Sequence, residues 1–311
     1  MKRRKFIIST AAFGSLYPFF ELFAIKNRKF KVSLNPGSIG ASYGMSELID
    51  VAIKYGFEGI SPNVSELQSF NKNESNSIIE KIISNNIHWD SAGLPIDFRS
   101  DEKKFLNHLN NLEGYCKTMK KFNINKLNTW IMPTHDKLTY NQNFKLHSNR
   151  LKKIGDIINK FEIKLGLEYV GVRTLMNKDK YPFIHTINEV RDLIENIGLN
   201  SIRYQLDSFH WYCSQDTIES YEFLNNEDII TVDLNDAVIG RDPNSQLDYE
   251  RELPASTGVI NIKEFINFLI RIEYSGSVRA EPFNKKLALM DDEAAVKLTS
   301  KHLFKSINGS D

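Results

Sequence analysis

The chain has 311 residues, of which 41% are hydrophobic, and this is enough to bury a full core. Its 40 Lys and Arg residues against 39 Asp and Glu leave a net charge of +1, so overall charge gives no attraction to nucleic acid or to anionic membranes. Cys116 and Cys213 lack any metal-binding spacing. We expect two unpaired thiols, with a disulfide formed after export as the alternative.

The first residues, MKRRKFIISTAAFGSLYPFFELFA, have a basic start, an apolar middle and a small residue at the end. Pro18 and Glu21 interrupt the segment, which is too short for a membrane span of about 20 apolar residues. Its RRKFI run resembles the twin-arginine signal that exports folded proteins. We expect residues 1–27 to be this export signal, or an uncleaved anchor, and residues 28–311 to form one periplasmic domain that meets the membrane only through the signal.

From Lys31 onward, the sequence predicts strands and helices in alternation. Eight such units without a linker between them predict an α/β fold of the (β/α)8 TIM barrel type. A doubly wound open sheet is the alternative, but no glycine fingerprint follows the first strand. The predicted strands are 31–35, 57–61, 87–93, 126–132, 163–170, 201–207, 228–236 and 276–283. The predicted helices are 45–56, 75–86, 101–122, 143–161, 187–198, 216–224, 260–274 and 292–307.

Each of the last four strands carries an acid in its polar register near the carboxyl end, namely Glu168, Asp207, Asp233 and Glu281. In such barrels the carboxyl ends of the strands hold the site. Four carboxylates that converge there repel one another unless a cation lies among them. Oxygen ligands favour Mn²⁺ or Mg²⁺. His210 follows Asp207 by three residues, a step that brings both side chains to one side.

Ion pairs inside the barrel are the alternative use of these acids. Glu168 or Glu281 could pair with Arg279 or Arg203, which lie in the same polar registers.

These residues resemble the xylose isomerase-like barrel superfamily, which contains sugar isomerases and epimerases, inosose-processing enzymes and endonuclease IV. The resemblance covers residues 31–306 and rests on the order of short motifs: LEYV, DSFH, an acid-rich seventh strand end, GVIN and AEPF. It implies that Glu168, Asp207 and Glu281 are metal ligands and that His210 contacts the substrate. The family's fourth ligand is usually a histidine in a His-x-Lys-Asp run, and Asp233 stands in its place.

The resemblance implies a metal-dependent isomerase or epimerase of a sugar or keto-sugar, which works by proton transfer next to a metal-bound carbonyl. Glu168 and Glu281 would remove and return the proton, while His210 and Arg241 would orient substrate oxygens. His88 and Trp130, at the ends of the third and fourth strands, are further candidates for sugar contacts. For Trp130, buried packing is the alternative.

Three other functions fit the same sequence less closely. A lyase could use the same ion and base to eliminate a group from a 3-keto-glycoside. A DNA-repair enzyme needs a metal cluster richer in histidine and a basic surface, so we expect no nucleic-acid partner. A non-catalytic sugar-binding barrel is the third, for which Asp233 is the only hint. In all but the DNA-repair case the partner is a small carbohydrate.

Overall fold

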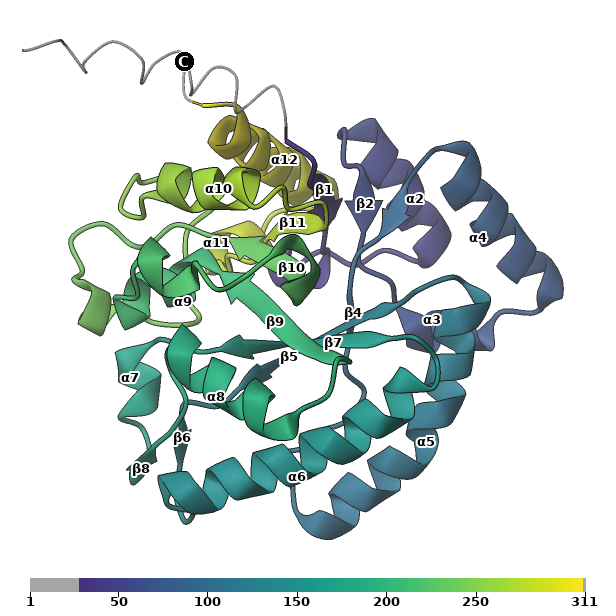
Figure 1. The fold of residues 1–311 in the computed structure, drawn as a ribbon. Coiled ribbons are helices and arrows are strands. Elements are labelled where there is room, and N and C mark those ends of the chain that lie inside the picture. The colour runs from purple at the N-terminus through teal and green to yellow at the C-terminus, as the bar shows by residue number, and fades with distance from the viewer. Residues whose placement is uncertain (1–27, 310–311) are drawn as a thin grey trace, which may run out of the picture.

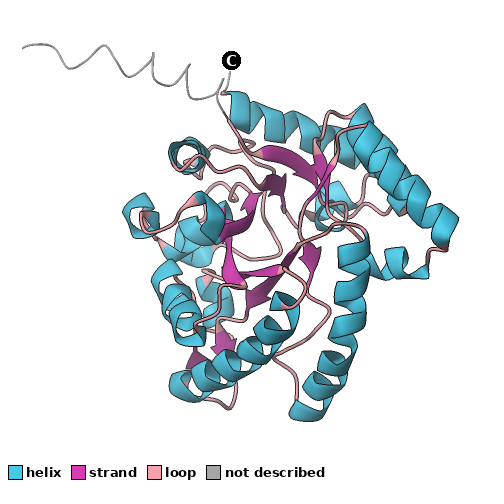
Figure 2. Cartoon of the chain, turned by 45° about the vertical axis from the view of Figure 1, so that its right-hand side comes forward, coloured by secondary structure: helices cyan, strands magenta, loops and turns pink. Residues whose placement is uncertain are grey.

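The computed structural model describes residues 28–309, so the predicted export signal at residues 1–27 lies outside them. Within the described part, parallel strands form a curled sheet surrounded by helices (Figures 1 and 2). The strand order is β3-β2-β1-β11-β10-β9-β7-β5-β4. The strands are β1 (Lys31–Leu34), β2 (Gly59–Ile60), β3 (His88–Trp89), β4 (Ala92–Gly93), β5 (Lys126–Ile131), β7 (Lys164–Tyr169), β9 (Ile202–Asp207), β10 (Ile229–Leu234) and β11 (Ser277–Ala280).

The sheet has nine strands rather than the eight predicted, because the predicted strand 87–93 is interrupted at Asp90 and Ser91. Its first part, β3, pairs with β2, and its second part, β4, pairs with β5. Only two residues separate β3 and β4, which lie at the two ends of the strand order. The interrupted strand therefore joins these two ends and closes the barrel. The (β/α)8 prediction is confirmed, with one of the eight barrel strands bent in the middle.

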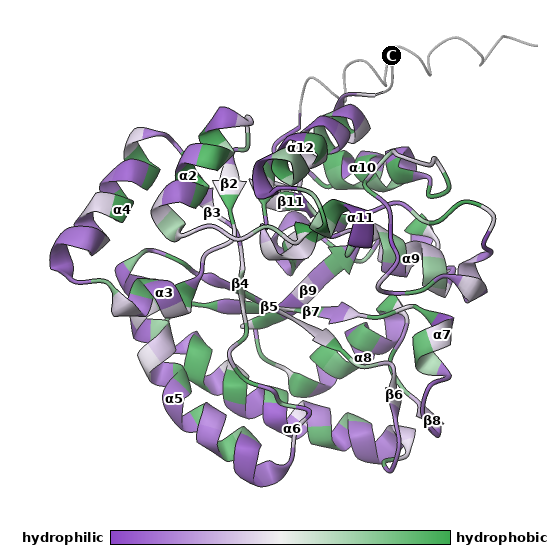
Figure 3. Ribbon diagram, turned by 180° about the vertical axis from the view of Figure 1, so that it is seen from behind, coloured by the Kyte–Doolittle hydropathy of each residue, from purple (hydrophilic) through white to green (hydrophobic). Residues whose placement is uncertain are grey.

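Helices cover the outside of the barrel and follow the strands as expected. Stripes of hydrophilic and hydrophobic residues alternate along the outer helices, as expected where one helix face packs on the sheet (Figure 3). The main helices are α2 (Met45–Lys54), α4 (Lys72–Ser84), α5 (Glu102–Lys121), α6 (Tyr140–Asn159), α8 (Ile187–Ile197), α10 (Ile262–Arg271) and α12 (Asp292–Asn308). Shorter ones are α3 (Val64–Ser69), α7 (Arg173–Met176), α9 (Ser208–Ser214) and α11 (Lys285–Ala288). In residues 28–309, no helix is both long and apolar enough to cross a membrane.

The helix predicted at 216–224 is wrong. The Asp207 side chain accepts a hydrogen bond from the Phe209 amide (2.6 Å) and caps α9, which starts directly after β9. The later segment forms only a 3₁₀ turn, at Ile218–Tyr221. The sequence also gave no sign of the small antiparallel pair β6 (Thr134–His135) and β8 (Tyr181–Pro182).

Cys116 and Cys213 are both buried and unpaired, which confirms the expectation of two free thiols. Burial raises the pKa of Cys116 to about 12 and raises that of Cys213 further still. Neither thiol is therefore a nucleophile at neutral pH.

Candidate metal centre and active site

Four acidic side chains from four neighbouring strands converge inside the carboxyl end of the barrel. Glu168, Asp207, Asp233 and Glu281 each offer a carboxylate oxygen, and these oxygens all lie within 4.8 Å of one another. The backbone register explains this, because Asp207 on β9 pairs with Asp233 on β10, which in turn pairs with Arg279 on β11, two residues before Glu281. We call these four residues the acid cluster.

The acid cluster is buried, and its charges act strongly on one another. Burial raises the pKa of Glu168 well above its ordinary value, and the Glu281, Asp207 and Asp233 carboxylates raise it further. Burial and then Asp233 raise the pKa of Glu281 to about 8. Burial raises the pKa of Asp207 to about 6, although Arg251 opposes the shift. Two carboxyl groups with pKa values near neutrality can exchange protons with a substrate.

Arg251, from the long loop after β10, lies against the acid cluster. Its Nη1 atom donates to Asp207 Oδ2 (2.8 Å) and lies 3.4 Å from Glu281 Oε2, and its Nη2 atom donates to Asp248 Oδ1 (2.8 Å). Its guanidinium lies over the Phe209 and Phe283 rings, 5.0 and 4.9 Å from their centroids. Burial would lower the pKa of Arg251, but the surrounding carboxylates raise it. Arg251 is therefore a permanent cation that offsets part of the acid charge.

Asp233 is held by a second buried arginine, Arg279. Arg279 Nε donates to Asp233 Oδ1 (2.7 Å), and its Nη1 atom donates to Asp90 Oδ2 (3.1 Å). Gln205 Nε2 donates to the other oxygen of Asp233 (2.8 Å). The predicted alternative paired Glu168 or Glu281 with Arg279 or Arg203, and in the described residues neither glutamate forms an ion pair with those arginines. Arg279 pairs with Asp233 and Asp90, and the arginine that pairs with Glu281 is Arg251. Arg203 instead lies half-exposed, 3.8 Å from Asp228.

The residues after Asp233 position the site. Asn235 Nδ2 donates to both oxygens of Asp207 (3.1 Å each), and Asn235 Oδ1 accepts from the Glu281 amide (2.9 Å). The Asp236 carboxylate accepts from four backbone amides, those of residues 237, 257, 258 and 260. Asn235 therefore orients two acids of the cluster, and Asp236 fixes the loop that leads into α10.

His210 lies beside the acid cluster, as the sequence predicted from its spacing to Asp207. Its ring atoms come within 4.8 Å of oxygens of Glu168 and Asp207. Burial and then Arg251 lower the pKa of His210 to about 3, so the ring is neutral at physiological pH. Its Nε2 atom lies 3.3 Å from Arg251 Nη2 and 3.7 Å from Asp248 Oδ1. His210 is thus held as an uncharged polar group at the site.

The other predicted substrate contacts lie at different levels of the barrel. Arg241 pairs with Glu250 at 2.7 Å, whereas the arginine that contacts the acid cluster is Arg251. His88 lies towards the amino ends of the strands, where its Nε2 atom is 3.1 Å from the hydroxyls of both Ser33 and Ser277. Trp130 is 39% exposed and stands at the rim, so it is not a packing residue.

Arg251 and Asn235 were missed as site residues. Asn235 lies in the run that the family resemblance singled out, so its position was available. Arg251 lies in a polar loop without periodicity, and only the folded loop shows that it, rather than Arg241, returns to the barrel.

The donor set fits a divalent cation. Glu168 Oε1 is buried and has no hydrogen-bond partner in the described part of the chain, so it is free to bind an ion. Glu168, Asp207 and Glu281 could hold the cation, with Asp233 or His210 as a further ligand. Hard oxygen donors with one imidazole suit Mn²⁺, Mg²⁺ or Zn²⁺. A bound dication would also offset the negative charge of the acid cluster that Arg251 does not neutralise.

A cavity of about 580 Å³ opens beside the acid cluster, over the carboxyl ends of the first strands. Glu281 and Arg279 line its inner wall, and Asn35, Ser61 and Asn128 contribute polar side chains around it. A cavity of this volume can accept a small polar molecule and bring it against Glu281.

Fold and site together define an α/β barrel with a buried carboxylate centre of the metal-binding kind at the carboxyl ends of its strands. A family model described as "Xylose isomerase-like TIM barrel" matches residues 49–305, and the chain belongs to this family. The inosose isomerase of Halalkalibacterium halodurans is 23% identical over 197 residues, which cover 63% of this chain and 67% of that protein. The inosose isomerase of Bacillus subtilis is 25% identical over 209 residues, which cover 65% of this chain and 69% of that protein.

Solved structures show the same fold. A xylose isomerase domain protein from Alicyclobacillus acidocaldarius superimposes with a TM-score of 0.78 and 20% identity over 89% of this chain and 98% of that one. The IOLI protein, with a bound zinc atom, superimposes with a TM-score of 0.75 and 18% identity over 89% of this chain and 98% of that one. A D-psicose 3-epimerase superimposes with a TM-score of 0.67 and 16% identity over 90% of this chain and 100% of that one.

Proposed function

We propose that this chain is a divalent-metal-dependent isomerase or epimerase that acts on a sugar, a keto-sugar or an inosose. The observation that carries the proposal is the acid cluster, whose four carboxylates, three buried and that of Glu281 half-buried, meet within 4.8 Å while Glu168 Oε1 remains unpartnered in the described residues. The family supports it, because it groups this chain with inosose isomerases. The zinc bound by the IOLI protein supports a metal here, and Mn²⁺ or Mg²⁺ are the ions we expect.

The bound ion would supply Lewis-acid stabilisation of negative charge as it develops on a substrate oxygen. The chain's own residues would move the proton. Glu168 and Glu281 come from β7 and from the end of β11, and their carboxylate oxygens meet within 4.8 Å, so one can accept a proton while the other returns it. Arg251 fixes the Glu281 carboxylate and adds positive charge beside the reacting centre.

Proton transfer is tested by hydrogen exchange in D₂O. The purified chain is stripped of metal, reloaded with Mn²⁺, Mg²⁺ or Zn²⁺, and incubated with a panel of inososes, ketohexoses and 3-keto-glycosides while proton NMR follows the C–H next to the carbonyl. We expect metal-dependent exchange, and a loss of turnover of about 10²–10⁴-fold in Glu168→Gln and Glu281→Gln. If the two glutamates act on opposite faces of the carbon, each variant keeps exchange on one epimer only.

Glu250→Gln is the matched control, because Glu250 pairs with Arg241 outside the acid cluster. Full turnover in Glu168→Gln on a substrate that the wild type converts would refute the proposal. The products separate the alternatives, since a changed stereocentre indicates an epimerase, a shifted carbonyl an isomerase, and a released aglycone the lyase.

We further propose that the enzyme acts on its carbohydrate outside the cytoplasm. This rests on the twin-arginine-like run at residues 1–27 alone. Periplasmic fractionation of the full chain and of an Arg3→Lys, Arg4→Lys double variant tests it, and equal export of both would contradict it.

A further inference from the structure

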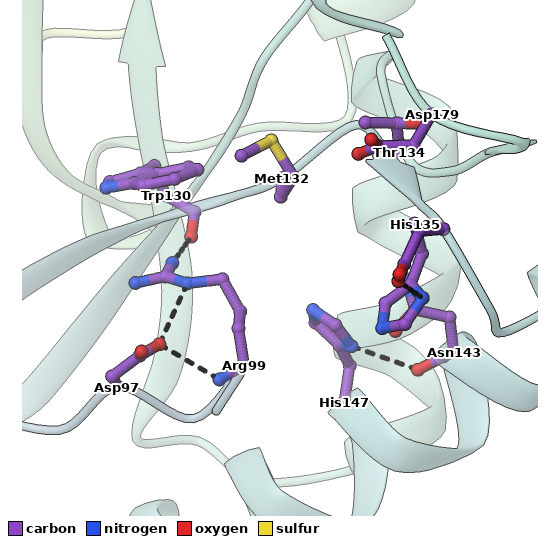
Figure 4. A pocket seen from close by; sticks show the side chains of 10 residues that line it. Asp97, Arg99, Trp130, Met132, Thr134, His135, Asn143, His147 and Asp179 are labelled. Carbon is purple, nitrogen blue, oxygen red and sulfur yellow. Dashed lines mark hydrogen bonds and ion pairs between the residues drawn. The ribbon is translucent and has the colours of Figure 1, made fainter. Parts of the chain in front are cut away.

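A second pocket, of about 360 Å³, lies at the carboxyl end of β5 (Figure 4). Trp130, Arg99, His135, Asn143 and His147 are among its lining residues, and we call it the Trp130 pocket. Trp130 on β5 pairs in register with Glu168 on β7. Because neighbouring strands lie about 4.8 Å apart, the backbone of Trp130, which lines this pocket, lies directly beside that of Glu168. Its volume is in the lower part of the range of small-molecule pockets, about 300–1,000 Å³.

His147, on α6, points an unpartnered nitrogen into the Trp130 pocket (Figure 4). The residue is 2% exposed, and its Nε2 atom has no hydrogen-bond partner among residues 28–309. Its Nδ1 atom donates to the Asn143 carbonyl (3.0 Å), so Nε2 carries the lone pair and requires a donor. Burial lowers the pKa of His147 to about 3, so the ring is a neutral acceptor. Phe98 and Phe183 hold the ring, with centroids 5.3 and 4.8 Å away.

Two more polar groups face the same space. Asn143 is 1% exposed, and its Oδ1 atom is also without a partner in the described residues. His135 Nδ1 accepts from the amides of residues 137 and 138 (3.0 Å each), so its Nε2 atom carries the proton and is a donor. A buried acceptor that has no hydrogen-bond donor costs about 1–3 kcal/mol. The acceptors His147 Nε2 and Asn143 Oδ1 therefore indicate a ligand that offers hydroxyl donors.

An aromatic side chain and the local charges restrict that ligand further. The Arg99 guanidinium lies 4.2 Å from the Trp130 ring centroid and donates to the Trp130 carbonyl, while 39% of Trp130 stays exposed. Arg99 is neutralised by Asp97 at 3.2 Å, and Asp136 and Asp179 lie at the rim. This charge disfavours an anion. An uncharged ring that carries hydroxyl groups fits the aromatic face and the neutral acceptors.

We propose that the Trp130 pocket is a subsite for a second hydroxylated ring, so that the substrate of the acid cluster is a two-ring glycoside rather than a monosaccharide. The statement about the substrate rests on the proposed function, whereas the pocket's affinity for a sugar ring does not. The first ring would lie against Glu168 and Glu281, and the second would pass Trp130 and donate a hydroxyl hydrogen to His147 Nε2.

Binding without turnover tests the subsite. Calorimetry on the full chain with Mn²⁺ measures the affinity for one-ring and two-ring probes, none of which has a carbonyl group. The pairs compared are methyl β-glucoside with methyl β-cellobioside and methyl α-glucoside with methyl α-maltoside. Trehalose is compared with both glucosides. We expect at least one two-ring probe to bind about tenfold more tightly than its one-ring counterpart. His147→Phe keeps the ring shape and removes the acceptor, so it should abolish this difference.

Asn143→Leu is a second variant with the same expected effect, and His302→Phe is the control, because His302 bonds the Pro254 carbonyl away from the pocket. Circular dichroism establishes which variants fold. Equal affinity for one-ring and two-ring probes, or unchanged two-ring binding in a folded His147→Phe or Asn143→Leu, would overturn the subsite. Failure of the proposed function would instead appear as full turnover in Glu168→Gln.

Discussion

Replacing Arg251 by methionine would remove one of the two buried arginines that pair with the acid cluster. The guanidinium bonds Asp207 and Asp248 at 2.8 Å each, lies 3.4 Å from Glu281, and is 2% exposed. Removing one partner of a buried ion pair costs about 3–5 kcal/mol, because the remaining charge stays buried and unpaired. Methionine keeps an apolar chain between the two phenyl rings, so the loss reports charge rather than volume. Out of a total of about 5–15 kcal/mol, this is a large fraction of the stability.

Urea unfolding in EDTA measures the effect. We expect Arg251→Met to lower the free energy of unfolding by about 3–5 kcal/mol, and added Mn²⁺ to restore part of the loss, since a dication can replace the missing charge. Arg203→Met is the matched control, because this half-exposed guanidinium lies 3.8 Å from Asp228 and should contribute about 0–1 kcal/mol. A loss below about 1 kcal/mol in Arg251→Met would refute the electrostatic reasoning.

The same variant makes a prediction about pH. Arg251 lowers the pKa values of Asp207 and Glu281, which are still raised to about 6 and about 8. Without it they rise further, so the folded state binds more protons than the unfolded state. The free energy of unfolding then falls as pH rises through these values. We expect the loss in Arg251→Met to be larger at about pH 8 than at about pH 6.

Four further substitutions test other parts of the structure. The pKa of His147 falls from 6.5 to about 3 on folding, so between these values the unfolded state binds more protons and the free energy of unfolding decreases as pH falls. In urea unfolding, His147→Phe should lack this contribution, so its free energy of unfolding should decrease by about 1.4 kcal/mol less than that of the wild type for each pH unit below 6.5. An equal decrease in both proteins would contradict the neutral buried ring. Asp236→Ala leaves four backbone amides without their acceptor and should cost about 2–4 kcal/mol in thermal unfolding, whereas a cost below about 1 kcal/mol would mean that water replaces the carboxylate. Gly59→Ala places a methyl group 2.2 Å from His88 Cε1 and should lower the free energy of unfolding by about 1–3 kcal/mol. Gly114→Ala lies in α5, where no atom comes within 4 Å of the added methyl group, and should raise the free energy of unfolding by about 0.5–1 kcal/mol.

The alternation of apolar strands and amphipathic helices was sufficient to predict the barrel and the strands that carry Glu168, Asp207 and Asp233. Parallel pairing then brings these acids together, because residues at the same register on neighbouring strands lie at one level. The break at Asp90 and Ser91 was not predictable, since it depends on β3 and β4 pairing with different neighbours. The helix expected at 216–224 failed for a local reason, as the Asp207 cap starts α9 earlier and uses up the connection.

Loop residues were harder to place than strand residues. Arg241 and Arg251 lie in one polar loop, and no periodicity distinguishes them. The antiparallel bridge between Asp236 and Glu252 brings Arg251, the residue before Glu252, back to the end of β10. His88 was expected at the carboxyl rim, but it is the first residue of β3 and pairs with Gly59, so its side chain lies near Ser33 and Ser277 instead. Side-chain direction in an interrupted strand follows from its partners rather than from its own sequence.

Calorimetric titration of Mn²⁺ into the metal-stripped chain tests most directly whether the acid cluster is a metal centre. We predict one bound ion per chain, with affinity reduced by at least about tenfold in Glu168→Gln and unchanged in Glu250→Gln. No saturable binding of Mn²⁺, Mg²⁺ or Zn²⁺ by the wild type, or the same affinity in Glu168→Gln as in the wild type, would contradict it.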